Sequence, residues 1–180
     1  MADEYAVRFI DIFVKAVKKG PTKDGFNMIP GLFSWANTLP MGRVLGATPN
    51  GRRAGEPINH GANPLPGFKE SGELTAMALA VSSVQPMWGN TAPIQLEIDP
   101  ILGKDEGGVA KMVSFLTTYC CDLNGTLVNI NILDKDTILD AHAHPERHPD
   151  LVVRVTGFSA YFCNLSQDFR QLVVDRIIRG

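Results

Sequence analysis

The sequence has few cysteines and almost no net charge. It contains three cysteines among 180 residues, and two of them, Cys120 and Cys121, are adjacent. Such a set does not form the disulfide framework of a small secreted protein and suits a reducing compartment. With 17 basic and 19 acidic residues the net charge is −2, so the chain lacks the basic field that attracts nucleic acid or anionic lipid. We therefore expect no nucleic-acid partner and no membrane partner.

Long apolar runs are also missing. No stretch approaches the roughly 20 residues that cross a bilayer, and the opening residues, MADEYAVRFIDIF, lack the zones of a signal peptide. We therefore expect a cytoplasmic protein. The residues that are present, 44% hydrophobic and 20% charged, suffice for a core within one domain or within part of a larger one.

Helix and strand patterns alternate along most of the chain, an order typical of α/β proteins. Residues 3–19 predict an amphipathic helix that stops at Gly20-Pro21. Residues 26–68 are rich in proline and glycine and predict a long irregular segment with short strands. We divide the chain into a segment 1–68 and a second part 69–180. The second part predicts, in order, a helix (73–84), a strand (93–99), a helix (108–122), a strand (125–133), a helix capped by Asp134, an interrupted strand (151–162) and a terminal helix capped by Ser166.

Two clusters of reactive side chains are explained better by a structural role than by metal binding or redox chemistry. His142, His144 and His148 are close in sequence, but the first two point to different faces of a helix, and no carboxylate or cysteine has zinc-ligand spacing. We favour a solvated helix end and expect no metal. Cys120 and Cys121 have no neighbour that lowers a thiol pKa, and adjacent thiols rarely bridge without strain. We favour core packing for both.

A glycine in the middle of a strand pattern is the strongest signal. LVVRVTGFSAYF (151–162) is rich in β-branched and aromatic residues, yet Gly157 interrupts it. Glycine weakens a strand because it packs no side chain and loses the most backbone freedom on ordering. The interruption indicates either an ordinary turn or bulge, or a position at which the α-carbon itself is needed.

This stretch resembles the signature of a known family. VVRVTGFSAYF is similar to the glycyl radical motif of the pyruvate formate-lyase and diol-dehydratase-like superfamily, in which an arginine lies three residues before a glycine that an aromatic residue follows. GATPNGRRAGEPI (46–58) and NINILDKDTILDAHAHPERHPDL resemble further family segments, and LSQDFRQLVVDRI (165–177) resembles the terminal helix, with Gln171 and Arg176 in the usual frame. The resemblance covers essentially the whole chain.

The resemblance implies a fold and a mechanism. The fold is the C-terminal part of a ten-stranded α/β barrel, with a buried, hairpin-like glycine loop between a strand and the terminal helix. The chain itself binds no cofactor; an activating enzyme with a [4Fe-4S] cluster and S-adenosylmethionine installs the radical. A larger partner subunit carries the thiyl cysteine, and a small substrate undergoes C–O, C–N, C–S or C–C cleavage. The catalytic residue is Gly157, with loop support from Arg154, Val155, Thr156, Phe158 and Ser159.

Several positions depart from the family pattern, and two alternatives stay open. Thr156 stands where the family has a smaller residue and Phe158 where it has tyrosine, so the substrate is not identified, although GFSAYF resembles the dehydratase and lyase branch. The family's thiyl cysteine lies far upstream of its glycine, and we assign that role to neither Cys120 nor Cys121. The alternatives are an autonomous glycyl radical cofactor that repairs oxygen-cleaved enzyme, and a non-enzymatic α/β interaction module.

Overall fold

The computed structural model describes residues 2–33, 37–65, 73–86, 92–155 and 157–179. Their mixed α/β content confirms the fold class, and no helix among them is long and apolar enough to cross a membrane. The elements are, in chain order, α1 (Ala2–Val17), α2 (Thr38–Arg43), α3 (Glu73–Ser83), β1 (Pro93–Ile98), η1 (Pro100–Gly103), α4 (Glu106–Thr117), η2 (Thr118–Asp122), β2 (Leu127–Ile132), α5 (Lys135–Ala143), η3 (Pro145–Arg147), β3 (Val152–Arg154), β4 (Ser159–Tyr161), η4 (Phe162–Asn164) and α6 (Gln167–Arg179).

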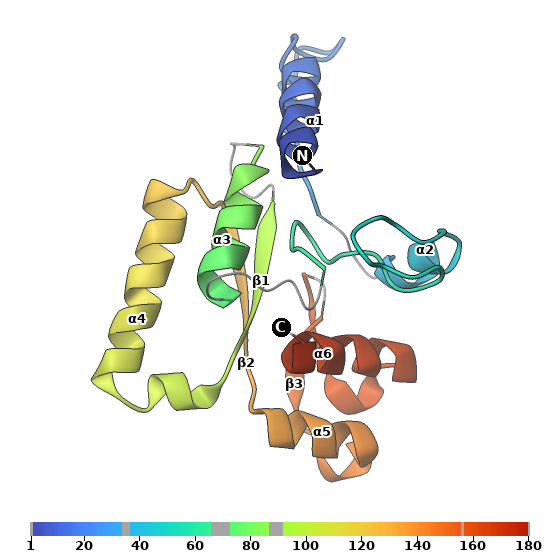
Figure 1. Ribbon diagram of the computed structural model, residues 1–180, viewed down its shortest axis with the longest axis vertical. Helices are drawn as coiled ribbons and strands as arrows, with labels where there is room; N and C mark the ends of the chain where they lie inside the picture. The colour runs from blue at the N-terminus through green and yellow to red at the C-terminus, as the bar shows by residue number, and fades with distance from the viewer. Residues whose placement is uncertain (1, 34–36, 66–72, 87–91, 156, 180) are drawn as a thin grey trace.

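A parallel pair of strands, β1 and β2, runs through the middle of the molecule (Figure 1). Parallel strands need a crossover connection, and α4 supplies it. This helix begins at Asp105, whose carboxylate accepts a hydrogen bond from the Gly108 amide at 2.5 Å. Figure 1 shows α3 and α4 on the same side of the strand pair.

The two faces of this strand pair differ in polarity, because successive side chains of a strand point to opposite sides. One face carries Ile94, Leu96 and Ile98, which are buried in a cluster with residues of α3 and α4 and with Tyr119. The opposite face carries polar side chains at its central positions, and we call it the polar face. Its residues are Gln95 and Glu97 from β1, paired in register with Asn129 and Asn131 from β2.

A second apolar core lies in residues 133–177, which we call the C-terminal unit. Both predicted caps are confirmed there: Asp134 accepts a hydrogen bond from the Thr137 amide at 2.9 Å, and Ser166 accepts one from the Phe169 amide at 3.4 Å. The hairpin of β3 and β4 packs with α5 and α6 around seven buried residues, Ile138, Ala141, Val153, Val155, Phe162, Val173 and Val174. This cluster shares no residue with the one around β1, so the hairpin is supported by a core of its own.

Helix α1 confirms the amphipathic helix predicted for residues 3–19, but much of its apolar face is uncovered. Phe9 is 67% exposed and Tyr5 and Ile12 are also mostly exposed, whereas Ile10 is buried. In Figure 1 the helix projects away from the strand pair, at the end of the molecule opposite α5. Within the described residues, most of this apolar surface has nothing packed on it.

The described part of the proline- and glycine-rich segment, residues 26–33 and 37–65, does not contain the short strands that its sequence predicted. Between residues 20 and 65 the described part of the chain forms α2 and otherwise turns and loops. Prolines remove the amide donors that a strand ladder requires. The buried side chain of Arg52 holds the segment instead, by donating hydrogen bonds to the carbonyl oxygens of Gly46, Arg53 and Glu56.

Cys120 and Cys121 are both exposed, so the core packing predicted for them is wrong. They lie in the π-helical turn η2, whose width differs from that of an α-helical turn. This turn buries Tyr119 completely, with its ring stacked on Phe115 at a centroid distance of 6.1 Å. Burial raises the pKa of the Tyr119 hydroxyl. The tyrosine therefore takes the core position, and the two thiols face outwards.

Candidate functional site

Gly157 lies at the tip of the hairpin formed by β3 and β4. The Val155 amide donates a hydrogen bond to the Phe158 carbonyl at 2.8 Å and closes the hairpin just below the tip. Gly157 has a φ of +88°, a conformation that glycine adopts freely and that side chains disfavour. Apart from its two chain neighbours, a Cβ placed on it would meet no atom within 4 Å. The surroundings thus leave open space beside the α-carbon.

The predicted hairpin-like glycine loop is present, but the prediction that it is buried is wrong for this chain. Gly157 is exposed, and Phe158 is 41% exposed. The hairpin strands are three residues each, and the helices of the C-terminal unit pack against their bases and leave the tip outside. Within the described residues the tip is left uncovered.

Asparagines of the polar face hold the strand that precedes the tip. The Arg154 amide donates to Asn131 Oδ1 at 2.5 Å, and Asn131 Nδ2 donates back to the Arg154 carbonyl at 2.9 Å. The Arg154 side chain donates from Nε to Asn129 Oδ1 at 3.2 Å and from a terminal nitrogen to Ser159 Oγ at 3.4 Å. One residue of the hairpin is therefore joined to β2 through both its backbone and its side chain.

The Arg176 side chain, from α6, also holds this strand. Its guanidinium donates to the Val155 carbonyl at 2.7 Å and to the Arg154 carbonyl at 3.1 Å. The same group forms an ion pair with Glu97 of the polar face, with 3.3 Å between Nε and Oε1. Arg176 is only 6% exposed, so these contacts replace its water.

Burial shifts the pKa values of the ionisable groups around Arg176. Burial, reinforced by the nearby guanidinium, lowers the pKa of His60 to about 3. The imidazole is therefore neutral at pH 7, and its Nε2 lies 3.3 Å from Arg176, where it accepts a hydrogen bond. Burial raises the pKa of Glu97 and lowers that of Arg176, and in each case the partner's charge opposes the shift. Their pairing makes two buried charges tolerable.

The structure brings together most of the residues that the sequence selected in the hairpin. Arg154 and Ser159 are linked by a hydrogen bond, and Val155 is fully buried in the core of the C-terminal unit. Phe158 follows the tip and is 41% exposed. Thr156 lies outside the described residues.

Sequence reasoning missed the residues beneath the hairpin. It selected none of His60, Glu97, Asn129 and Asn131. It noted that Arg176 stands at a usual position of the family's terminal helix, but predicted no role for it. A signal for some of them was present: PIQLEI and LVNINI place polar residues at alternate positions of otherwise apolar strands. Such a pattern indicates a strand face with polar partners.

The three clustered histidines lie on α5 and the turn that follows it. His148 Nε2 lies 2.6 Å from Asp140 Oδ2, and His144 Nδ1 lies 3.7 Å from Glu146 Oε1. The hydrogen bond from His148 is the main cause that lowers the pKa of Asp140. Among the described residues no three histidine, cysteine or carboxylate side chains are placed to hold a metal ion.

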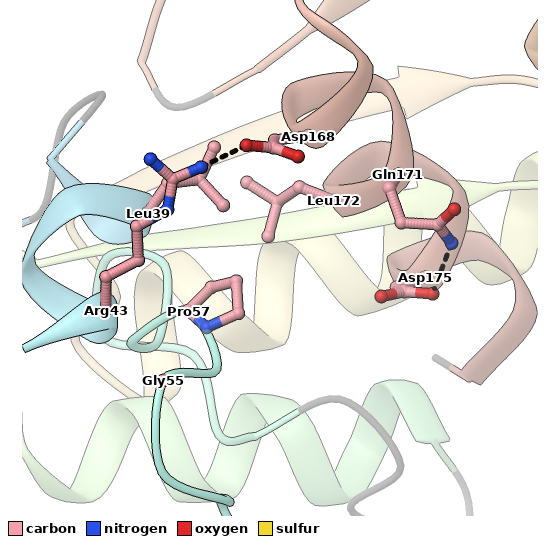
Figure 2. A pocket seen from close by; sticks show the side chains of 8 residues that line it. All are labelled: Leu39, Arg43, Gly55, Pro57, Asp168, Gln171, Leu172 and Asp175. Atoms are coloured by element: carbon pink, nitrogen blue, oxygen red, sulfur yellow. Dashed lines mark hydrogen bonds and ion pairs between the residues drawn. The ribbon is translucent and has the colours of Figure 1, made fainter. Parts of the chain in front are cut away.

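A groove of about 230 Å³ lies between the proline-rich segment and α6 (Figure 2). The Arg43 guanidinium pairs with the Asp168 carboxylate there, and Gln171 Nε2 donates to Asp175 at 2.9 Å. No residue of the hairpin lines it; the lining residues are Leu39, Arg43, Gly55, Pro57, Asp168, Gln171, Leu172 and Asp175. The groove marks where α2 and its loop meet α6.

Comparison with known families identifies the class of protein that this hairpin belongs to. A family model described as "Glycine radical" matches residues 58–163, which include β1, β2 and the whole hairpin. The chain belongs to this glycine radical family, and the superfamily recognised in the sequence is confirmed.

Individual relatives extend the match to nearly the whole chain. The isethionate sulfite-lyase of Oleidesulfovibrio alaskensis is 33% identical over 97% of this chain and 22% of its own length. The glycerol-bound B12-independent glycerol dehydratase of Clostridium butyricum has a TM-score of 0.85 and 31% identity over 97% of this chain and 22% of its own. A structure from Roseburia inulinivorans concerned with 1,2-propanediol dehydration has a TM-score of 0.86 and 31% identity, over 97% and 21%. The chain thus spans about a fifth of the length of these relatives.

Proposed function

We propose that this chain is the radical-carrying part of a glycyl radical lyase or dehydratase. It stores an unpaired electron on the α-carbon of Gly157 and passes it to a cysteine on a larger partner. The observation that supports this most directly is the hairpin tip: Gly157 has a φ of +88°, lies between anchored strands and has open space beside its α-carbon. The match to the glycine radical family includes this hairpin.

The chemistry explains why the position must be glycine. Loss of a hydrogen atom from the α-carbon leaves a radical between an electron-donating amide nitrogen and an electron-withdrawing carbonyl. With no Cβ the centre becomes planar without a clash, and no side-chain hydrogen competes for abstraction. Every other amino acid would add both a steric and a chemical liability.

The reaction sequence needs two components outside this chain. An activating enzyme with a [4Fe-4S] cluster transfers one electron to S-adenosylmethionine, which releases methionine and a deoxyadenosyl radical. That radical takes a hydrogen atom from Gly157 and leaves as deoxyadenosine. The glycyl radical then takes the hydrogen atom of a cysteine thiol, and the resulting thiyl radical abstracts hydrogen from a substrate carbon. When the product radical regains its hydrogen from the thiol, the radical returns to Gly157.

The larger partner would also complete the fold. Among the described residues β1 pairs with β2 alone, Phe9 and its neighbours on α1 are exposed, and the hairpin tip is uncovered. Relatives that are more than four times longer than the stretch they share with this chain have room for the missing strands. We propose that β1 and β2 belong to a ten-stranded barrel that the partner completes in the cytoplasm, and that the thiyl cysteine faces Gly157 within it.

The reaction class follows from the named relatives. One is named a sulfite-lyase and another a glycerol dehydratase, so both release a group from carbon. We propose that the substrate is a small molecule that loses a group bonded to the carbon next to the one attacked. The hairpin sequence does not choose among C–O, C–N, C–S and C–C cleavage.

Electron paramagnetic resonance tests the proposal. Anaerobic incubation of the chain with its partner, the activating enzyme, reductant and S-adenosylmethionine should give a doublet signal, which deuterium at the glycine α-carbon should collapse. Gly157→Ala should abolish the signal and should strain the backbone by about 1–2 kcal/mol. Gly51→Ala is the matched control, because Gly51 has a φ of +96° and equally open surroundings but lies outside the hairpin.

Air provides the second readout. Oxygen adds to a carbon radical and breaks the backbone, so activated chain should be cut at Gly157, and Gly51→Ala should be cut like wild type. The proposal fails if activated wild-type chain keeps its full mass and gives no signal, or if Gly157→Ala is cut equally. Exchange of the chain into an oxygen-cleaved enzyme, with no stable larger partner, would favour the repair protein instead.

A further inference from the structure

We propose that Arg176 is the positioning residue of the glycine hairpin, and that its guanidinium fixes the two carbonyl groups that lead into the tip. This inference rests on the proposal that Gly157 carries the radical and adds a residue from a different element. Arg176 is on α6, and the carbonyls belong to Arg154 and Val155.

The contacts fix the peptide groups on both sides of the Val155 α-carbon. The Val155 carbonyl accepts a hydrogen bond from Arg176 at 2.7 Å, while the Val155 amide donates to the Phe158 carbonyl at 2.8 Å across the tip. The preceding carbonyl, of Arg154, receives one hydrogen bond from Arg176 at 3.1 Å and another from Asn131 at 2.9 Å. These bonds determine where the tip begins and in which direction it leaves the C-terminal unit.

Two further groups contact the guanidinium. Glu97 pairs with it from β1 at 3.3 Å, and neutral His60 accepts from it at 3.3 Å. Four separate parts of the chain therefore meet at one buried side chain: the proline-rich segment, β1, the hairpin and α6. The Arg176 side chain thus joins the C-terminal unit to the polar face of the strand pair.

The geometry requires arginine rather than any cation. Its planar fork of donors reaches two carbonyl oxygens, a carboxylate and an imidazole at the same time, whereas a lysine ammonium is a compact charge on a flexible stem. Arg176→Lys should therefore keep the ion pair with Glu97 and lose at least one carbonyl contact. Arg176→Met removes all of them at similar side-chain length.

Two measurements on the chain in complex with its partner test this role. Hydrogen exchange at the Val155 amide needs no radical, and it should be roughly tenfold faster in Arg176→Met than in wild type, as expected for the loss of a charge-assisted hydrogen bond. After anaerobic activation, the doublet should be broader and should decay several-fold faster than in wild type. Arg176→Lys should fall between the two.

Arg43→Met is the control, because Arg43 forms an exposed ion pair with the same helix, through Asp168, and has no contact with the hairpin carbonyls. It should leave Val155 exchange and the doublet unchanged. The inference is overturned if folded Arg176→Lys and Arg176→Met, checked by circular dichroism, keep wild-type exchange and a wild-type doublet. If Arg176→Met does not fold, Arg176→Lys decides alone. A wild-type complex that never gives a doublet contradicts the proposed function, and the exchange data still decide whether Arg176 holds the hairpin.

Discussion

The two ends of this chain treat their apolar side chains in opposite ways. The C-terminal unit has a closed core in which Phe162 is fully covered and Val153, Val155 and Val173 are buried. The N-terminal helix α1 leaves Phe9 and most of its apolar neighbours exposed. Burial of apolar surface is the main force that stabilises a fold.

The difference shows which part of the chain lacks a surface to cover its apolar side chains. The glycine hairpin stands on a core that residues 133–177 complete by themselves, so its shape is set within this chain. The exposed side of α1 has the amphipathic pattern of a packed helix but no partner surface among the described residues. We infer that the hairpin stands on an apolar core of its own, with polar support from β1, β2 and His60, and that α1 is the part that a larger assembly would cover.

Truncation of one phenylalanine in each region gives the sharpest comparison and the largest expected effect. Phe162→Ala should lower the free energy of unfolding by about 3–5 kcal/mol, because it empties a closed core. Phe9→Ala should change it by at most about 0.5 kcal/mol in the isolated chain. Urea unfolding followed by circular dichroism measures both. Similar losses for the two variants would contradict the division into covered and uncovered regions.

A smaller effect is expected where the proline-rich segment packs on itself. A Cβ on Gly42, in α2, would overlap the Glu56 carbonyl oxygen and lie 2.7 Å from the Pro57 α-carbon. Gly42→Ala should therefore cost about 1–3 kcal/mol and speed exchange of the Ile58 amide, which is bonded to α2 at Thr38. Gly46→Ala is the control, since its Cβ would meet nothing within 4 Å. Equal behaviour of the two variants would show that α2 does not pack on the loop.

The smallest expected effect is the pH dependence of stability that comes from His60, where the proline-rich segment meets the C-terminal unit. The pKa of His60 is lowered to about 3 in the folded chain, whereas an unfolded histidine binds its proton near pH 6.5. The stability that neutral His60 contributes is therefore complete above about pH 6.5 and is lost as the pH falls towards 3. The slope cannot exceed about 1.4 kcal/mol per pH unit for one proton.

Urea midpoints at pH 7, 6 and 5 measure this loss. The groups that face His60 modify it: Arg176 keeps its charge, and Glu97, whose pKa is raised by burial, contributes with the opposite sign. His60→Gln should remove the loss of stability that His60 causes between pH 6.5 and 5, and His144→Gln, at an exposed position, should leave that loss in place. An unchanged slope in His60→Gln would mean that His60 is already solvated.

Local patterns in the sequence predicted local structure well. The 3.6-residue apolar repeat found α1, the Asp134 and Ser166 caps were placed correctly, and Gly157 marked the hairpin tip. These features depend on neighbouring residues, which a single sequence displays. Even so, core packing was predicted for the adjacent cysteines, because no neighbour lowers a thiol pKa and cysteine is often buried. That prediction is wrong, since they lie exposed in a π-helical turn, which the local pattern did not indicate.

The support beneath the hairpin was not predictable in the same way. Glu97 and Arg176 are 79 positions apart in sequence, and nothing local indicates that they pair. His60 comes from a segment whose prolines and glycines predicted only loops and short strands. Polar positions in the two central strands indicated that partners exist, but their identity depends on how three distant elements meet.

Chimeric enzymes would be assembled most simply with a crossover between Ile132 and Leu133. On one side of that point lies the polar face, and on the other lie the hairpin and Arg176. If residues 133–180 of this chain were joined to another protein that has a carboxylate at the position of Glu97, Arg176 could form its ion pair there. A recipient without that carboxylate would bury an unpaired cation, at a cost of about 3–5 kcal/mol. A chimera of two related proteins should therefore be stable only when it contains both members of this buried ion pair.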